Sequence, residues 1–144
     1  MPPDREIPGS PQAWLERAKG HLALATQPKP AGAFWEDQCF LLQQAAEKAL
    51  KAVYQQLGLV FRYTHDLEEL GTQLETSGVP IPPVVREAVI LTRYAFETRY
   101  PGPFEPVTED EYREAIRLAE AVVTWADSVM TGRSPNDSGT GRHT

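Results

Sequence analysis

The feature that most constrains the fold is the spacing of apolar residues in the last third of the chain. Apolar side chains recur every three or four positions at Tyr112, Ala115, Ile116, Ala119, Val122, Val123, Ala126 and Val129. This period places them on one face of an α-helix. Thr108 and Glu111 precede the pattern at the spacing of a capping box, in which each side chain binds a backbone N–H group of the first turn. The pattern predicts a long amphipathic helix that begins after Thr108.

Helical spacing also predicts four earlier helices, over the approximate ranges 11–27, 33–57, 65–78 and 83–100. Ser10 followed by Pro11 is a typical start for the first of them, and Gly58 is a typical stop for the second. Breaks rich in Pro and Gly separate the helices, and no segment alternates apolar and polar residues as a strand does. The chain is therefore expected to be all-α, a four- to five-helix up-and-down bundle.

The length of 144 residues suits one domain. We expect a flexible N-terminus over residues 1–9, the bundle over residues 10–131 and a disordered tail over residues 132–144. The net charge of −6 argues against broad electrostatic binding of nucleic acid. No apolar run approaches the ~20 residues that a membrane span requires. The N-terminus also lacks the apolar core of a signal peptide, so no membrane contact and a cytoplasmic location are expected.

The sequence contains no pattern that is typical of a metal or cofactor site. No glutamate has a histidine three residues later, as inward-facing metal sites of helical bundles require, and no glycine-rich phosphate loop occurs. Cys39 is the only cysteine, which excludes a disulfide within the chain, and we expect it to be a small buried apolar residue. His21 stands beside the apolar seam of the first helix, where a partly buried packing role is expected. Cofactors are expected to be none.

Several strings occur in an order that resembles the HEPN family, named for a domain of higher eukaryotes and prokaryotes thought to bind nucleotides. They are a Trp-Leu-x-x-Ala first helix, "DQCFLLQQAAEKALKAVYQQLG", "THDLEEL" and "YAFETRYPG". The similarity covers roughly residues 12–130. It implies a helical bundle that forms a homodimer. It further implies a small nucleotidyltransferase as partner, because bacterial members are often encoded beside one and act with it as a toxin–antitoxin-like pair.

Many members of this family are metal-independent ribonucleases whose site is an Arg, four to six residues, and then a His. Histidine serves as general acid or base near neutral pH, and arginine stabilises the charged phosphorane. In this chain two residues separate Arg62 from His65 and three separate Arg17 from His21, so the motif is absent. The expected function is a binding subunit for a nucleotidyltransferase, with a groove for a nucleotide. The alternative is a ribonuclease, with RNA as substrate, that uses Arg62, His65 and Arg99.

The string "FRYTHDLEEL" holds the main candidate site. Asp66 with Glu69 fits a capping box, and Thr64 could cap one turn earlier. For His65 two roles are open, a hydrogen bond to a carbonyl or carboxylate of a neighbouring helix, or contact with a ligand. The free N–H groups at the start of the third helix are a ready anion site. Together with the family-like Arg-Tyr-Pro string, they predict four nucleotide-binding residues, which are Arg62, His65, Arg99 and Tyr100.

Three further surfaces are interpreted from the sequence. On the second helix a solvated polar face is expected, made of Gln44, Glu47, Lys48 and Lys51. Arg93 and Glu97 are expected to make an exposed pair of small value. Some of the alanines of the second helix and some aromatic residues are expected to form a two-fold interface, in line with the family resemblance, or else these side chains complete the core around the loop "PGPFEP". The aromatic residues are Phe34, Trp35, Tyr54, Tyr94, Phe96 and Tyr100.

Overall fold

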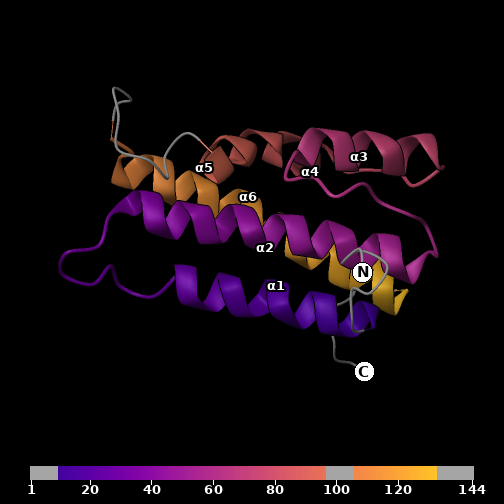
Figure 1. Cartoon of the computed structure of the whole chain (residues 1–144), viewed down its shortest axis with the longest axis horizontal. Helices are drawn as coiled ribbons and strands as arrows, with labels where there is room; N and C mark the ends of the chain where they lie inside the picture. The colour runs from indigo at the N-terminus through magenta and orange to yellow at the C-terminus, as the bar shows by residue number, and fades with distance from the viewer. Residues whose placement is uncertain (1–9, 97–105, 133–144) are drawn as a thin grey trace.

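The computed structural model describes residues 10–96 and 106–132, and over these ranges it is all-helical (Figure 1). Its elements are α1 (Pro11–Ala25), α2 (Trp35–Gln56), α3 (Leu67–Thr76), α4 (Pro83–Glu87), the 3-10 helix η1 (Ala88–Thr92), α5 (Arg93–Phe96) and α6 (Glu109–Thr131). Because α4, η1 and α5 follow one another directly, the described part contains five helical runs. The predicted all-α bundle is confirmed. None of these helices is long and apolar enough to cross a membrane.

Helix ends lie where the local chemistry predicts them. The Ser10 hydroxyl accepts a hydrogen bond from the Ala13 N–H group at 3.2 Å at the start of α1. Thr108 and Glu111 form the predicted capping box of α6, with bonds of 2.9 and 3.1 Å. Gly58 follows α2 with a φ of 70°, a left-handed conformation that costs glycine little. These features fix the start of α1, the end of α2 and the start of α6.

The core is built around α2, which packs between α1 and α6 (Figure 1). Its alanines at 45, 46, 49 and 52 are fully buried and let the neighbouring helices approach closely. Tyr54 and Tyr94 are also buried within the chain, and Trp35 stacks on Tyr112 at 4.7 Å between ring centroids. The alanines of α2 therefore complete the core of one chain, which is the second of the two roles expected for them, and a two-fold interface made by other side chains stays a prediction. Phe34 remains 66% exposed.

The fourth helix is interrupted by η1 instead of running unbroken over residues 83–100. Val85, Ala88 and Leu91 are buried, with α4 packed against α6 and η1 packed against α2, α3 and α6. Thr92 at the end of η1 accepts a hydrogen bond from the Leu67 N–H group at 3.0 Å, which ties this run to the start of α3. Residues 97–100, like most of the predicted tail, lie outside the described residues.

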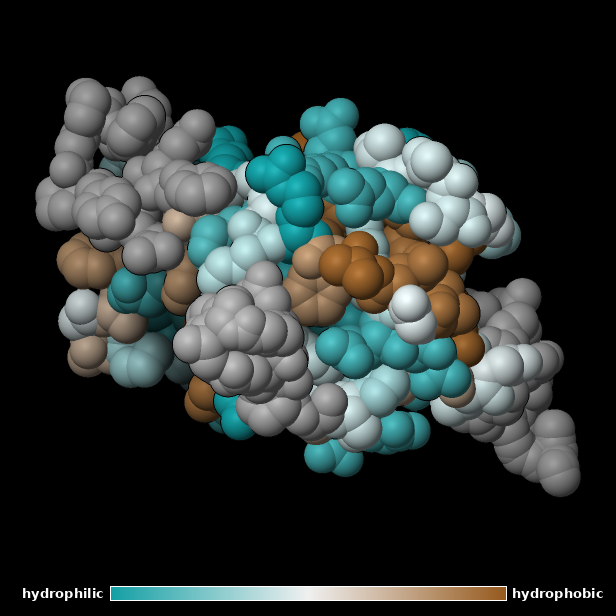
Figure 2. Space-filling view, turned by 45° about the vertical axis from the view of Figure 1, so that its right-hand side comes forward, coloured by the Kyte–Doolittle hydropathy of each residue, from teal (hydrophilic) through white to brown (hydrophobic). Residues whose placement is uncertain are grey.

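The link between α2 and α3 is not a simple turn but runs back along α2. The Leu59 N–H group donates to the Tyr54 carbonyl at 2.9 Å, and the Lys51 ammonium lies 5.2 Å from the ring centroids of both Phe61 and Tyr63. The link therefore brings the start of α3 beside the middle of α2. At the end of the molecule where α2 gives way to the link, Figure 2 shows an apolar area, with Leu57 and Val60 among the exposed side chains.

Candidate functional site

A buried row of polar side chains on α2 faces this link. Gln43, Glu47 and Lys51 stand four residues apart, and all three are buried. The Lys51 ammonium lies 2.7 Å from one carboxylate oxygen of Glu47, and each side chain is only 4% exposed. The prediction that Glu47 and Lys51 belong to a solvated face is therefore wrong. The link that folds back over α2 removes them from water.

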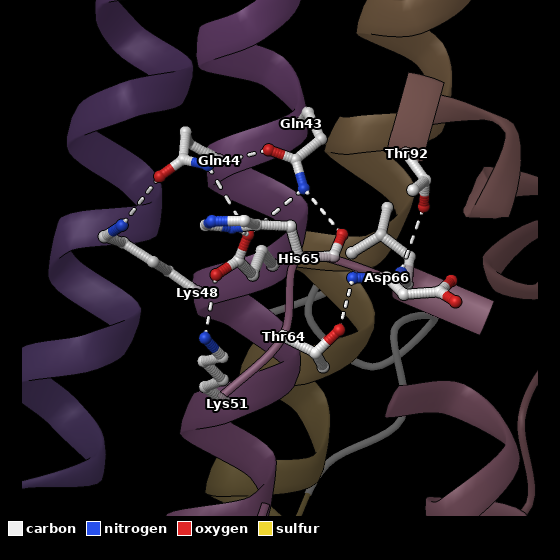
Figure 3. Close-up of polar contacts among 10 residues, drawn as sticks. Gln43, Gln44, Lys48, Lys51, Thr64, His65, Asp66 and Thr92 are labelled. Carbon is white, nitrogen blue, oxygen red and sulfur yellow. Dashed lines mark hydrogen bonds and ion pairs between the residues drawn. The ribbon is translucent and has the colours of Figure 1, made fainter. Parts of the chain in front are cut away.

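His65 closes this row from the link. Its Nδ1 lies 2.9 Å from the second carboxylate oxygen of Glu47, while its own side chain is 48% exposed. The Gln43 amide donates to the same carboxylate oxygen and to the His65 carbonyl, each at 3.1 Å. His65 thus has the carboxylate partner on a neighbouring helix that one of its two predicted roles requires. Figure 3 shows its imidazole lying over α2 and directed towards α1.

The Glu47 carboxylate is held in its charged form. Burial by itself would raise its pKa, but the neighbouring Lys51 ammonium and the hydrogen bonds from Lys51, His65 and Gln43 lower the pKa overall. A carboxylate that is buried, charged and bonded to an imidazole fixes the orientation of that ring. The row is therefore a preorganised support for a half-exposed histidine.

A second group of polar side chains lies on the side of α2 that faces α1. The Lys48 ammonium donates to the Gln44 amide oxygen at 3.1 Å, and Figure 3 shows both side chains directed towards α1. On α1, Arg17 and His21 stand four residues apart. The pKa of His21 is lowered by burial and by repulsion from Lys48 and Arg17. Burial also lowers the pKa of Lys48, with Lys51 and Arg17 adding to the effect against the attraction of Glu47. These cations therefore lie close enough to repel one another.

Arg62 is not part of either group. Its Nε lies 3.1 Å from the Glu69 carboxylate, and its side chain is 73% exposed. Asp66 caps α3 by accepting from the Glu68 N–H group at 3.0 Å, as predicted. The Asp66 N–H group, however, donates to the Thr64 hydroxyl at 3.0 Å. The predicted capping box of Asp66 and Glu69 is therefore wrong, because Thr64 takes the donor and Arg62 takes Glu69.

The first turn of α3 has fewer donors for an anion than the sequence predicts. The Leu67 N–H group is bound by Thr92 and the Glu68 N–H group by Asp66. Arg99 and Tyr100 lie outside the described residues, as does Glu97, the expected partner of Arg93. The nucleotide-binding role of Arg62, His65, Arg99 and Tyr100 stays a prediction. Among these four residues, His65 alone lies in the buried polar network that the structure describes.

Sequence reasoning missed Gln43, Glu47 and Lys51 as a buried set, because no local pattern marks it. Apolar residues flank this row on one side, but Gln44 and Lys48 widen the polar stripe on the other side, as on an ordinary solvated face. Once the link buries the row, its polar groups need the internal partners described above. Cys39 lies on the same helix and is buried as predicted; burial raises the pKa of its thiol to about 12.

Comparisons with known proteins agree with this architecture. The family model described as HEPN domain matches residues 11–129. The crystal structure of TT1696 from Thermus thermophilus is similar with a TM-score of 0.73 and 32% identity, covering 83% of this chain and 97% of that one. The structure of ST0689, described as an archaeal HEPN homologue, is similar with a TM-score of 0.69 and 26% identity, over 85% and 99% of the two chains. No curated protein matches the chain. The chain therefore belongs to the HEPN domain family.

Proposed function

We propose that this chain is a non-enzymatic HEPN subunit that forms a homodimer and pairs with a small nucleotidyltransferase in a toxin–antitoxin-like system. The observation that carries the proposal is membership of the HEPN family without the ribonuclease motif. No arginine in the chain is followed by a histidine after four to six residues. A groove beside His65 would bind a nucleotide, with Arg62, Arg99 and Tyr100 as further contacts.

The surroundings of His65 and Arg62 support a binding role over catalysis. A ribonuclease of this family needs arginine and histidine to act on one phosphate. Here Arg62 is engaged by Glu69 and His65 by Glu47. The two side chains therefore bind two different carboxylates.

The experiment is affinity purification of the tagged chain from its native host, followed by mass spectrometry. Recovery of a nucleotidyltransferase in stoichiometric amount is expected. Purification of the chain without any nucleotidyltransferase, combined with cleavage of RNA by the purified protein, would overturn the proposal.

The homodimer has its own test. The exposed apolar side chains Leu57 and Val60 (91% exposed) support a subunit contact at the area seen in Figure 2. Light scattering at micromolar concentration should give about twice the 16.0 kDa of one chain, since C₂ dimers are the commonest assembly. A mass equal to one chain at all concentrations would remove the dimer from the proposal.

The second candidate is a metal-independent ribonuclease that uses Arg62, His65 and Arg99. One observation favours it. The Glu47 carboxylate orients the half-exposed imidazole of His65 from 2.9 Å, as carboxylates do for histidines in acid–base catalysis. RNA cleavage that is lost in His65→Gln, with the melting temperature unchanged, would establish this candidate. Absence of cleavage by wild type would eliminate it.

A further inference from the structure

Most of the cations that the structure describes have a partner of opposite charge or an aromatic ring. Carboxylates lie beside Lys19, Lys51, Arg62, Arg86, Arg113 and Arg117. Aromatic rings lie beside Lys29 and Arg93. Arg17 and Lys48 differ, since within residues 10–96 and 106–132 no carboxylate makes an ion pair with either of them. The partner of Lys48 is the neutral amide of Gln44.

These two cations are neighbours across the contact between α1 and α2. The helices pack along their length, Arg17 and His21 are one helical turn apart on α1, and Gln44 and Lys48 are one turn apart on α2. Burial lowers the pKa of both His21 and Lys48, and repulsion from Arg17 adds to the effect at each of them. Figure 3 shows the imidazole of His65 directed to the same side as Gln44 and Lys48.

The local charge is opposite to that of the whole chain. Arg17, Lys48 and Lys51 carry three positive charges here and Glu47 one negative charge, an excess of two in a chain whose net charge is −6. The negative charge of Glu47 is neutralised by Lys51 at 2.7 Å, so it does little to compensate Arg17 and Lys48. Lys48 is half-buried and Arg17 is exposed beside it, and like charges held together in this way lower stability unless an anion binds there.

We propose that Arg17, His21 and Lys48, with His65 at the edge, bind a phosphate group, carried either by a mononucleotide or by the backbone of a short single-stranded RNA. Arginine binds phosphate through two parallel N–H donors, lysine adds a compact charge, and imidazole adds a further donor. The buried row of Gln43, Glu47 and Lys51 keeps α2 and the link in place below the site. The inference deepens the nucleotide part of the proposed function. It does not depend on the nucleotidyltransferase.

Titration calorimetry at low salt tests the site with four probes, which are ATP, AMP, adenosine and a 5′-phosphorylated RNA tetranucleotide. At least one phosphorylated probe should bind and adenosine should not. Arg17→Gln and Lys48→Gln should each weaken that binding about ten- to a hundredfold, the range of a charge-assisted contact. Lys19→Gln is the matched control, because Lys19 is an exposed cation of the same helix that pairs with Asp127 at 3.4 Å. It should change the affinity by less than about threefold.

The outcomes separate the sources and the competing explanations. Binding of ATP or AMP identifies a nucleotide, and binding of the tetranucleotide alone identifies RNA; either result supports the site. The inference is overturned if no phosphorylated probe binds wild type, if adenosine binds as well as AMP, or if all three variants bind equally. A structural role for Lys48 would instead lower the melting temperature of Lys48→Gln with binding unchanged.

A second readout locates the ligand without depending on affinity. The chain has three histidines, so the imidazole signals of His21, His65 and His143 can be followed separately by NMR. The phosphorylated probe should shift His21 and His65 and leave His143 in place. Shifts confined to His143 would overturn the site. If no phosphorylated probe binds but a nucleotidyltransferase is recovered from the host, only this inference is overturned. If a phosphorylated probe binds but no nucleotidyltransferase is recovered, only the proposed partner is overturned.

Discussion

Two rows of polar side chains run along α2 one residue apart, and they differ in what satisfies them. In the row of Gln43, Glu47 and Lys51 the two charged groups, Glu47 and Lys51, lie 2.7 Å apart and neutralise each other. In the row of Gln44 and Lys48 the charged group has a neutral amide as partner and is repelled by Arg17 of α1. The first row is buried and the second is half-buried.

This difference separates a structural role from a binding role. A buried charge without a partner is strongly destabilising, so loss of either charged group of the first row would lower the stability of the fold. The second row keeps like charges together at some cost in stability, which is typical of residues retained for a ligand. Stability measurements should therefore respond to the first row, and ligand measurements to the second.

The largest expected effect follows from removing one partner of the buried pair. Lys51→Met keeps much of the side-chain volume but leaves the Glu47 carboxylate buried beside His65 without its ammonium. The free energy of unfolding should fall by about 3–5 kcal/mol. Urea denaturation measures it. The matched change in the second row, Lys48→Met, should alter the same quantity by less than about 1 kcal/mol.

A double variant distinguishes a lost ion pair from lost packing. Glu47→Leu combined with Lys51→Met replaces both charges by apolar groups, and it should recover much of the loss, because two matched apolar partners leave no buried charge. A double variant as unstable as Lys51→Met alone would show that the charge pair is not the cause. The proposed structural role of the row of Gln43, Glu47 and Lys51 would then be wrong.

The dependence of stability on pH gives the next effect. The pKa of Glu47 is lowered in the folded state, so the unfolded chain binds its proton more readily. Its contribution to stability is complete above the unfolded pKa of about 4.3 and is lost as the pH falls through the lower folded pKa. Glu47→Gln should therefore lose less stability than wild type between pH 5 and pH 3, measured by urea unfolding at each pH. Parallel curves for the two proteins would contradict this assignment.

A smaller effect is expected in the second row, at His21. Burial and repulsion from Lys48 and Arg17 lower its pKa in the folded chain. The unfolded chain then binds more protons between this lowered pKa and about 6.5, so His21 makes stability rise with pH in that window. Lys48→Gln should raise the pKa of His21 and flatten this rise. NMR titration of the His21 ring measures the change, with His143 as the internal control.

The smallest effect is expected outside both rows, at the exposed pair of Arg62 and Glu69. Arg62→Gln should change the free energy of unfolding by about 0–1 kcal/mol, because water screens an ion pair in which one side chain is 73% exposed. Thermal melting of the variant is the measurement. A loss comparable to that of Lys51→Met would place Arg62 in the structural core of the site.

The helices themselves were predictable because their signals are local. Apolar spacing, the Ser10 cap and the capping box of Thr108 with Glu111 involve residues within a few positions of one another. The burial of Glu47 and Lys51 was not predictable from local signals. It depends on a link that runs back along α2 and on the contact of His65 with Glu47, 18 positions earlier in the chain. The partners of Asp66 and Glu69 were also misassigned. Their spacing predicts that the Glu69 side chain binds the Asp66 N–H group, but the Thr64 hydroxyl accepts from that N–H group and Arg62 pairs with Glu69.

The 3-10 helix η1 has a consequence for the rotational phase of the fourth helical run. Val85, Ala88, Leu91 and Tyr94 are all buried, each three positions after the last. In an α-helix such a series would turn by about 60° at each step, so Tyr94 would point away from the side that Val85 faces. With about three residues per turn, η1 keeps successive members in line. Substitutions that return residues 88–92 to an α-helix would therefore rotate Tyr94 out of the core by roughly a quarter of a turn.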